Sequence, residues 1–154
     1  AHYGYAFLRQ MDMKTLLSDV KTLRQNVGDR AILRAIHFFN ENERVTEQTK
    51  ALLSGDTQTF FDFVLKSGRS SFMYLQNVFT TKNVQEQGLS LALALTDTTI
   101  TDGAFRVHGG GFAGTIQAFV PVDETEAFVS TMRKSFGENS CYILKVRSHG
   151  GCEI

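Results

Sequence analysis

The chain has 154 residues, a hydrophobic content of 42% and a charged content of 21%. This length and composition suit one soluble globular domain, which we expect to span residues 1–154. Lysine and arginine together number 16, as do aspartate and glutamate, so the formal net charge is zero. The chain lacks the basic excess of a nucleic-acid-binding protein, and no apolar run is long enough to span a bilayer. We therefore expect neither a nucleic-acid partner nor a membrane partner.

Cys141 and Cys152 are the only cysteines in the sequence. One pair in a domain of this size is not a disulfide framework, and its spacing matches no zinc-binding pattern. We expect two free thiols in a reducing compartment, and hence a cytoplasmic protein whose own residues hold no metal.

The first half of the chain is predicted to be helical. Apolar residues repeat at helical spacing over residues 13–27, which predicts one amphipathic helix with Gly28 just beyond its C-terminus. Asp29 suits the N-cap of a second helix over about 30–53. His37 lies in the middle of that helix, where a lone histidine is more often packed or exposed than a ligand.

A third helix should follow a short turn. Gly55 is predicted to close the second helix and Asp56 to cap the third. The apolar face of the third helix is expected to hold Phe60, Phe61, Val64 and Leu65. The helix should end or bend at the polar segment 67–71. Its three serines beside Arg69 could bind an anion, although serines near a helix end more often form local caps.

The second half of the sequence predicts both helices and strands. A fourth helix is expected over 83–95, then a polar link over 96–102 and strands over 103–107 and 115–120. The inward-facing residues of that helix should be Val84, Leu91, Ala92 and Leu95.

A last helix and a last strand should complete the chain. Asp123 and Glu126 have the spacing of a capping box, with Asp123 as the N-cap, and Gly137 should end the helix. The buried face of the helix should hold Phe128, Val129, Met132 and Phe136. Residues 141–147 alternate as a final strand.

The most unusual stretch is a glycine-rich loop between the two middle strands. Gly109, Gly110, Gly111 and Gly114 fall within six residues. Such backbone adopts positive φ and permits close approach, and successive free amides can form a concave anion site. A hairpin needs only one or two such residues, so we favour close approach to a ligand or to another loop.

The same glycines have the spacing of the dinucleotide-binding fingerprint, Gly-x-Gly-x-x-Gly. That fingerprint requires a helix that begins inside the motif, whereas residues 115–120 indicate a strand. A nucleotide-binding oxidoreductase is therefore a distant alternative, which a helix starting at Gly111 would support.

The glycine-rich loop and the preceding helices resemble the galactokinase branch of the GHMP kinases, the superfamily of galactokinase, homoserine kinase, mevalonate kinase and phosphomevalonate kinase. The branch typically has Arg, an apolar residue and Thr, followed by Gly-Gly-Gly-Phe-Gly-Gly. Here Arg106, Val107 and His108 precede Gly-Gly-Gly-Phe-Ala-Gly. His108 replaces the usual threonine, and Ala113 replaces a glycine, which suggests that residue 113 does not need a positive φ.

The order and spacing of several helical motifs also match that branch, so the resemblance covers about residue 30 to the C-terminus. These motifs are Arg34-Ala35-Ile36-His37, Glu41-Asn42-Glu43-Arg44-Val45, Ala51-Leu52, Gly55-Asp56 and Ser67-Gly68-Arg69-Ser70-Ser71.

The resemblance implies an α+β fold, namely the ferredoxin-like C-terminal domain of a GHMP kinase, with an antiparallel sheet and extra N-terminal helices. It implies the C-terminal portion of a galactokinase, an enzyme that transfers the γ-phosphoryl group of ATP to the anomeric hydroxyl of galactose. ATP and Mg²⁺ would be bound mainly by an N-terminal GHMP domain that this sequence lacks. The chain alone should therefore be inactive.

The resemblance places no catalytic residue in this chain. The loop should instead line the cleft for substrate and phosphates; its residues are Gly109, Gly110, Gly111, Phe112, Ala113 and Gly114. Arg106 could support the loop or face the phosphates, but a structural ion pair is equally expected, and His108 could form a hydrogen bond at the loop. The alternative function is a stand-alone regulatory module that binds a sugar or a nucleotide.

Overall fold

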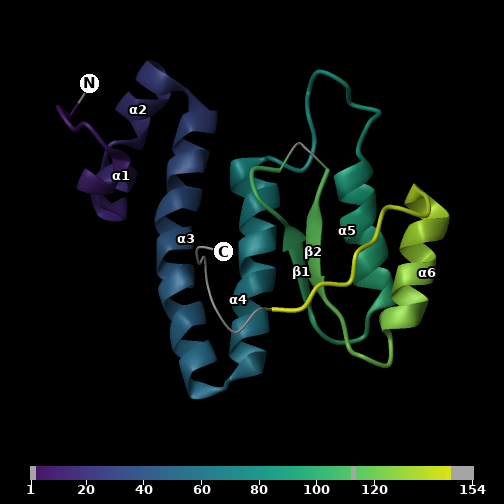
Figure 1. The fold of residues 1–154 in the computed structure, drawn as a ribbon. Coiled ribbons are helices and arrows are strands. Elements are labelled where there is room, and N and C mark those ends of the chain that lie inside the picture. The colour runs from purple at the N-terminus through teal and green to yellow at the C-terminus, as the bar shows by residue number, and fades with distance from the viewer. Residues whose placement is uncertain (1–2, 112–113, 147–154) are drawn as a thin grey trace, which may run out of the picture.

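The computed structural model describes residues 3–111 and 114–146, which form an α+β arrangement of helices and one two-stranded antiparallel sheet. Figure 1 shows α3 and α4 side by side, with the sheet between α4 and α5 and with α6 beyond α5. The elements are η1 (Leu8–Gln10), α1 (Met13–Ser18), α2 (Val20–Val27), α3 (Asp29–Ser54), α4 (Thr57–Ser70), η2 (Ser71–Leu75), α5 (Gly88–Thr99), β1 (Ala104–Val107), β2 (Ile116–Phe119) and α6 (Thr125–Phe136).

The N-terminal helix is divided in two, so the prediction of one helix over 13–27 is wrong. Asp19 separates α1 from α2 with φ −119° and ψ 20°. Its carboxylate accepts a hydrogen bond from the hydroxyl of Tyr3 at 2.5 Å. Aspartate is a poor residue for a helix interior because its side chain competes with the backbone for hydrogen bonds. The apolar face is nevertheless continuous, since Leu16 and Leu23 pack in one cluster with residues of α3.

The junction between α2 and α3 is tighter than expected. Gly28 ends α2 with φ 78°, as predicted, but it also occupies the position before α3. Asp29 is therefore the first helical residue and not the N-cap. Its carboxylate lies 2.6 Å from Arg24 Nε, so the side chain is used in an ion pair across the junction.

The turn between α3 and α4 follows the sequence prediction. Gly55 adopts the left-handed conformation with φ 73° and ψ 13°, and the Asp56 carboxylate accepts a hydrogen bond from the Thr59 amide at 3.0 Å. Both the glycine end and the aspartate cap are confirmed. The result is a long antiparallel pair of helices, of which α4 reaches the sheet.

Helix α4 lies directly on β1. A methyl group built on Gly68 would lie 3.0 Å from the Phe105 carbonyl oxygen and 3.2 Å from Arg106 Cβ. The missing side chain therefore allows this close contact between helix and strand. At the other end of α4, Phe60 and Phe61 pack against Phe119 of β2, with ring centroids 5.5 and 5.4 Å apart.

The sheet is a short hairpin with a defined register. Ala104 pairs with Phe119, and Val107 pairs with Ile116. Ala104 and Val107 are fully buried, and Val107 belongs to a core cluster with Val78 and Leu89. The predicted strands are confirmed, and the antiparallel hairpin presents the glycine-rich loop at one end.

Helix α5 begins later and ends later than predicted. It spans Gly88–Thr99, and the buried positions are Leu89 and Thr96, whereas Val84 and Leu91 are 64% and 53% exposed. The segment is apolar on nearly every side, so its pattern does not select a buried face. Thr96 is tolerated in the interior because its hydroxyl donates to the Ala92 carbonyl at 2.8 Å.

The predicted capping box of α6 is wrong. The N-cap position belongs to Glu124, without a side-chain cap. The Glu124 carboxylate instead accepts a hydrogen bond from the Thr101 amide at 2.9 Å and another from the Thr101 hydroxyl. This contact holds the two ends of the hairpin region together. Gly137 ends the helix as predicted, with φ 98°.

The buried face of α6 is narrower than predicted. Phe128 and Met132 are buried and Val129 is half-buried, whereas Phe136 is 37% exposed.

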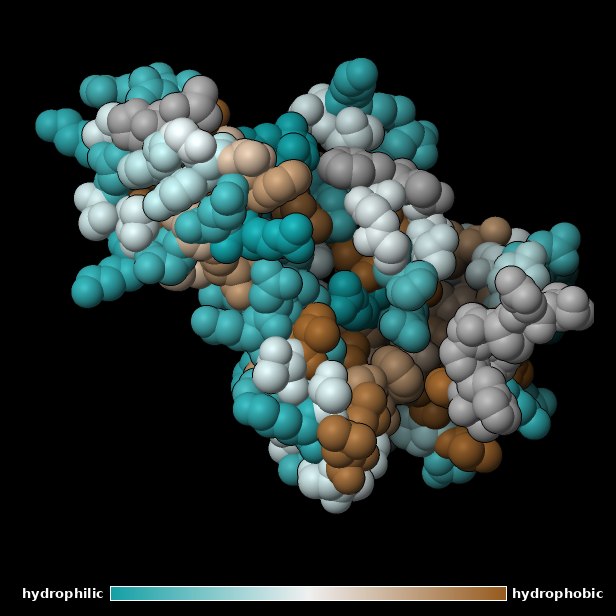
Figure 2. Space-filling view, turned by 60° about the vertical axis from the view of Figure 1, so that its left-hand side comes forward, coloured by the Kyte–Doolittle hydropathy of each residue, from teal (hydrophilic) through white to brown (hydrophobic). Residues whose placement is uncertain are grey.

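The segment 141–146 is not a strand, so the described part of the predicted final strand is wrong, while Arg147 lies outside the described residues. Tyr142, Leu144 and Val146 are 75%, 85% and 95% exposed. Alternation favours a strand only where another strand supplies hydrogen bonds. Figure 2 shows apolar side chains, in brown, exposed on the lower part of the face in view.

Candidate active-site loop

The glycine-rich loop joins β1 to β2 at the upper end of the hairpin in Figure 1. The His108 amide donates to the Thr115 carbonyl at 3.0 Å, which extends the pairing just beyond both strands. Gly109, Gly111 and Gly114 have φ values of 66°, 70° and 95°. Glycine is therefore required by conformation at three positions of the loop. Phe112 and Ala113 lie outside the described residues, and so does the expectation about the backbone of Ala113.

The loop is open at three glycines and tightly packed at one. A methyl group built on Gly109, Gly110 or Gly114 would meet no atom within 4 Å. On the buried Gly111, the same group would lie 2.2 Å from the Asn77 carbonyl oxygen. The close approach to another loop is thus confirmed at Gly111. The open positions leave the rest of the described backbone accessible to a ligand.

Arg106 leads into the loop and forms an ion pair. Its Nη1 atom lies 3.2 Å from the Glu41 carboxylate, and its Nε atom donates to the Val107 carbonyl at 3.2 Å. Of the two expectations for Arg106, the structural ion pair is the one that the structure contains. The His108 side chain is exposed, and its backbone takes part in the hairpin.

The Glu41 carboxylate is the centre of a polar network between α3, α4 and β1. Ser67 donates to it at 2.5 Å, and Arg44 lies 2.7 Å from it. Burial alone raises the pKa of the Glu41 carboxyl. The hydrogen bonds from Ser67 and Arg44 and the charges of Arg44 and Arg106 outweigh this effect, so the pKa is below its usual value. Glu41 is therefore held as an anion that fixes the end of β1.

His37 and Ser70 extend this network along the helix pair. The Ser70 hydroxyl lies 3.0 Å from His37 Nδ1 and accepts a hydrogen bond from Arg44 Nη2 at 3.0 Å. Burial is the largest cause of a lowered pKa at His37, and the charges of Arg44 and Arg106 act in the same direction. The histidine is a packed residue, one of the two roles expected for it from the sequence.

The serines of segment 67–71 are engaged mainly inside the domain. Ser71 occupies the C-cap position of α4, where its backbone amide bonds to the carbonyls of Gly68 and Ser67. Ser67, Ser70 and Ser71 are buried at 0%, 5% and 2% exposure, and the first two bond to the side chains of α3. Their spacing of three and four residues places them on one helix face. The sequence signal for this network was the serine spacing on one helix together with the charged run Glu41-Asn42-Glu43-Arg44 on the preceding helix.

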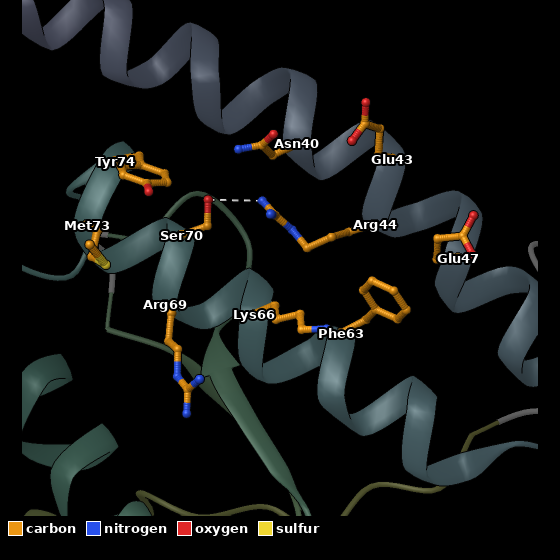
Figure 3. A pocket seen from close by; sticks show the side chains of 10 residues that line it. All are labelled: Asn40, Glu43, Arg44, Glu47, Phe63, Lys66, Arg69, Ser70, Met73 and Tyr74. Atoms are coloured by element: carbon orange, nitrogen blue, oxygen red, sulfur yellow. Dashed lines mark hydrogen bonds between the residues drawn. The ribbon is translucent and has the colours of Figure 1, made fainter. Parts of the chain in front are cut away.

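A cavity of about 430 Å³ lies beside the network, between α3 and α4, and Figure 3 shows the side chains that line it. Arg44 points from α3 toward Ser70, whereas Arg69 points away from the cavity. The lining combines the cations Arg44, Lys66 and Arg69 with the anions Glu43 and Glu47. This mixture of charges selects no class of ligand. Arg69 and Ser70, of the segment that could bind an anion, line this cavity, whereas no residue of the glycine-rich loop does.

A second cavity, of about 690 Å³, borders the loop at Gly114. It lies among β2, α5, α6 and the segment 139–144, and it includes Ile116, Met132 and Tyr142. The glycine-rich loop therefore borders one described cavity on the side of β2.

Asn77 is a loop contact that the sequence analysis missed. Its Nδ2 atom donates to the Gly110 carbonyl at 3.3 Å, and the residue is only 1% exposed. Only a weak signal for this contact was present in the sequence, since Asn77 follows Gln76 in a polar pair flanked by Leu75 and Val78.

Over residues 3–111 and 114–146, no cluster of three or more metal-binding side chains was found. None of the helices in those ranges combines the length and the hydropathy needed to cross a membrane.

The fold and the loop together define an α+β domain whose hairpin presents a glycine-rich turn anchored from a helix pair. No protein-family model matches the sequence. Curated relatives do: a galactokinase of Lacticaseibacillus casei is 32% identical over 114 residues, which is 72% of this chain and 27% of the relative. A galactokinase of Lacticaseibacillus paracasei matches with the same figures. A galactokinase of Glaesserella parasuis is 28% identical over 138 residues, or 89% of this chain and 33% of the relative.

The chain is a homologue of the galactokinases, and it corresponds to a segment of them. It spans about a quarter to a third of the length of these relatives. The resemblance drawn from the motifs is thereby confirmed at the level of the family.

Proposed function

We propose that this chain is the C-terminal portion of a galactokinase, in which the glycine-rich loop lines the active-site cleft. The whole enzyme would transfer the γ-phosphoryl group of ATP to the anomeric hydroxyl of galactose. The proposal rests on the homology to galactokinases together with the geometry of the loop. The matched relatives are named galactokinases, and the loop has three glycines at which no atom obstructs close approach.

The residues present fit a part of a phosphoryl-transfer site. Catalysis of this reaction rests on positioning and on charge stabilisation. The open backbone at Gly109, Gly110 and Gly114 would allow a phosphate or a facing loop to come close. The described residues hold no acidic cluster for Mg²⁺. ATP would supply the phosphoryl group, and Mg²⁺ and ATP would be held mainly by an N-terminal GHMP domain.

Arg106 would act indirectly in this proposal. Its guanidinium is held by Glu41 and by the Val107 carbonyl, so it is committed to the inside of the domain. It would orient the end of β1 and thus the start of the loop. His108 directly precedes the loop and is exposed, so its side chain would be free to face the cleft.

We propose in addition that the sheet is of the ferredoxin-like type and is completed by further strands. A two-stranded sheet is marginal by itself, and β2 has a described neighbour only at β1. The segment 141–146 alternates in sequence and lies beside β2 around a second apolar cavity of about 470 Å³. A strand from another part of the polypeptide could pair with β2 and so give residues 141–146 a partner.

A reducing compartment such as the cytoplasm suits the free Cys141 thiol.

A coupled assay of ADP release with galactose and Mg-ATP tests the proposed function. It is run on the longer protein that we propose to contain this chain and on the 154-residue chain alone. We expect turnover by the longer protein only, and no turnover when galactose is omitted. A longer protein that binds galactose or ATP without turnover would contradict the enzyme and favour a regulatory module.

A further inference from the structure

Three departures from ordinary local structure lie next to one another in the segment that faces the glycine-rich loop. Residues Ser71–Leu75 form a π-helical turn, closed by a hydrogen bond of 2.7 Å from the Gln76 amide to the Ser71 carbonyl. Gln76 then has φ 54° and ψ 46°. Over the described ranges it is the single residue other than glycine with a positive φ. Both features are uncommon and occur preferentially at functional sites.

The third departure is the side chain of Asn77. Its Oδ1 atom is buried and has no hydrogen-bond partner, and only one other described side chain, Ser90, has such an atom. The Nδ2 atom donates to the Gly110 carbonyl. Exchanging the two atoms would place an oxygen against that carbonyl, so the hydrogen bond fixes the orientation of the amide. A buried acceptor without a donor destabilises the folded protein.

The backbone of Asn77 meets the loop as well. Its carbonyl oxygen is the atom that a methyl group on Gly111 would strike, at 2.2 Å. One residue therefore contacts the loop twice, through its side chain at Gly110 and through its main chain at Gly111. These contacts join the loop to η2, which is continuous with α4 and packs against α3.

We infer that Asn77 is a positioning residue for the glycine-rich loop, kept at the expense of fold stability. An apolar residue of the same shape would remove the unpartnered acceptor from a position that is only 1% exposed. It would also release the Gly110 carbonyl. Departures from ordinary local structure occur in natural proteins mainly where function requires them. Here three of them lie together in residues 71–77, and the last of these residues, Asn77, contacts the glycine-rich loop.

The first test compares the wild-type chain with Asn77→Leu, which is close in shape, and with Ser90→Ala as the matched control. Ser90→Ala removes the other unpartnered buried oxygen, which lies on α5 and has no hydrogen bond to the loop. We expect Asn77→Leu to unfold at the same temperature as the wild type or higher. Amide hydrogen exchange in a peptide covering residues 103–117 should become faster in Asn77→Leu and should stay unchanged in Ser90→Ala. If Asn77→Leu does not fold, Asn77→Ala, which needs less space, provides the same comparison of exchange.

The second test is kinetic and rests on the proposed function. In the longer protein, Asn77→Leu should lower kcat for galactose phosphorylation by about ten-fold or more, because displaced cleft groups lose transition-state contacts. The KM for galactose should change far less, since we expect the sugar to be held mainly by the rest of the longer protein. Ser90→Ala should leave both constants unchanged.

The outcomes separate this inference from the proposed function. Unchanged exchange of the loop in Asn77→Leu would overturn the inference, and so would an unchanged kcat in an active enzyme. A wild-type protein without kinase activity would contradict the proposed function, while the exchange measurement would still decide the role of Asn77.

Discussion

The guanidinium of Arg106 lies 3.2 Å from the carboxylate of Glu41, although 65 residues separate them in the sequence. Glu41 belongs to the middle of α3, and Arg106 stands on β1 three residues before Gly109, the first residue of the glycine-rich loop. This ion pair ties the loop to the helical half of the chain. Because Ser67 and Arg44 also bond to Glu41, the carboxylate is shared among three elements.

Substitution of Glu41 should therefore weaken the fold and uncouple the loop. We expect Glu41→Gln to lower the free energy of unfolding by about 2 kcal/mol, since it removes hydrogen bonds to a charged group. A double-mutant cycle with Arg106→Gln, measured by urea unfolding, should give a coupling energy of about 1 kcal/mol.

The pair Glu47–Lys50 on the same helix provides the control. Its two side chains are 44% and 66% exposed, against 21% and 24% for Glu41 and Arg106. Its coupling energy should be below about 0.5 kcal/mol, as is usual for exposed pairs on a helix. Equal coupling in the two pairs would show that the Glu41 network has no special role.

The stability of the chain should depend on pH through His37. Burial and the charges of Arg44 and Arg106 lower its pKa in the folded state, against the opposing effect of Glu41. The unfolded chain therefore binds a proton more readily, and stability should fall as the pH decreases through about 6.5 and below. Urea unfolding at a series of pH values above 5 measures this slope.

His37→Gln should reduce that slope. Keeping the pH above 5 separates this effect from Glu41, whose lowered pKa makes it contribute only at more acidic pH. The same slope in His37→Gln and in the wild type would contradict the assignment.

Alanine substitutions in the loop should give a graded series. Gly110→Ala should change the free energy of unfolding by less than about 0.5 kcal/mol, because Gly110 has open space and no positive φ. Gly109→Ala should cost about 1 kcal/mol, since the space is open but φ is 66°. Gly111→Ala should cost about 3 kcal/mol, because backbone strain and the contact with Asn77 act together. Equal effects at the three positions would show that the packing at Gly111 is not rigid.

The two aspartates that precede α4 and α6 should differ in their effect. Asp56→Ala should lower the midpoint of thermal unfolding, because the Asp56 carboxylate caps α4 through the Thr59 amide. Asp123→Ala should leave it nearly unchanged, since the N-cap position of α6 belongs to Glu124. A comparable decrease of the unfolding midpoint in both variants would indicate that Asp123 caps α6, as the sequence analysis predicted.

The sequence predicted those parts of the fold that depend on neighbouring residues. Gly55, Asp56 and Gly137 mark helix ends through their own backbone or side chain, and the two middle strands show in the alternation on either side of the loop. The family followed from the joint order of the motifs, and the curated relatives agree with it.

The remaining features depend on partners that are distant in the sequence. Asp19 interrupts the first helix and bonds to Tyr3, and Glu124 bonds to Thr101. The serines of α4 bond to α3, and Asn77 meets the loop 33 residues later. Residues 141–146 have a strand pattern, but a strand requires a neighbour to pair with, and local patterns carry no information about that neighbour.

The measurement that tests the account most directly is the kinase activity of Gly110→Val in the longer protein, with thermal unfolding measured on the same sample. Gly110 has room for a side chain, so the fold should survive the substitution. If the loop lines the cleft of a galactokinase, the ADP release that depends on galactose should be lost while the unfolding temperature is retained. Full activity in the folded variant would contradict the central claim that this loop shapes the active site.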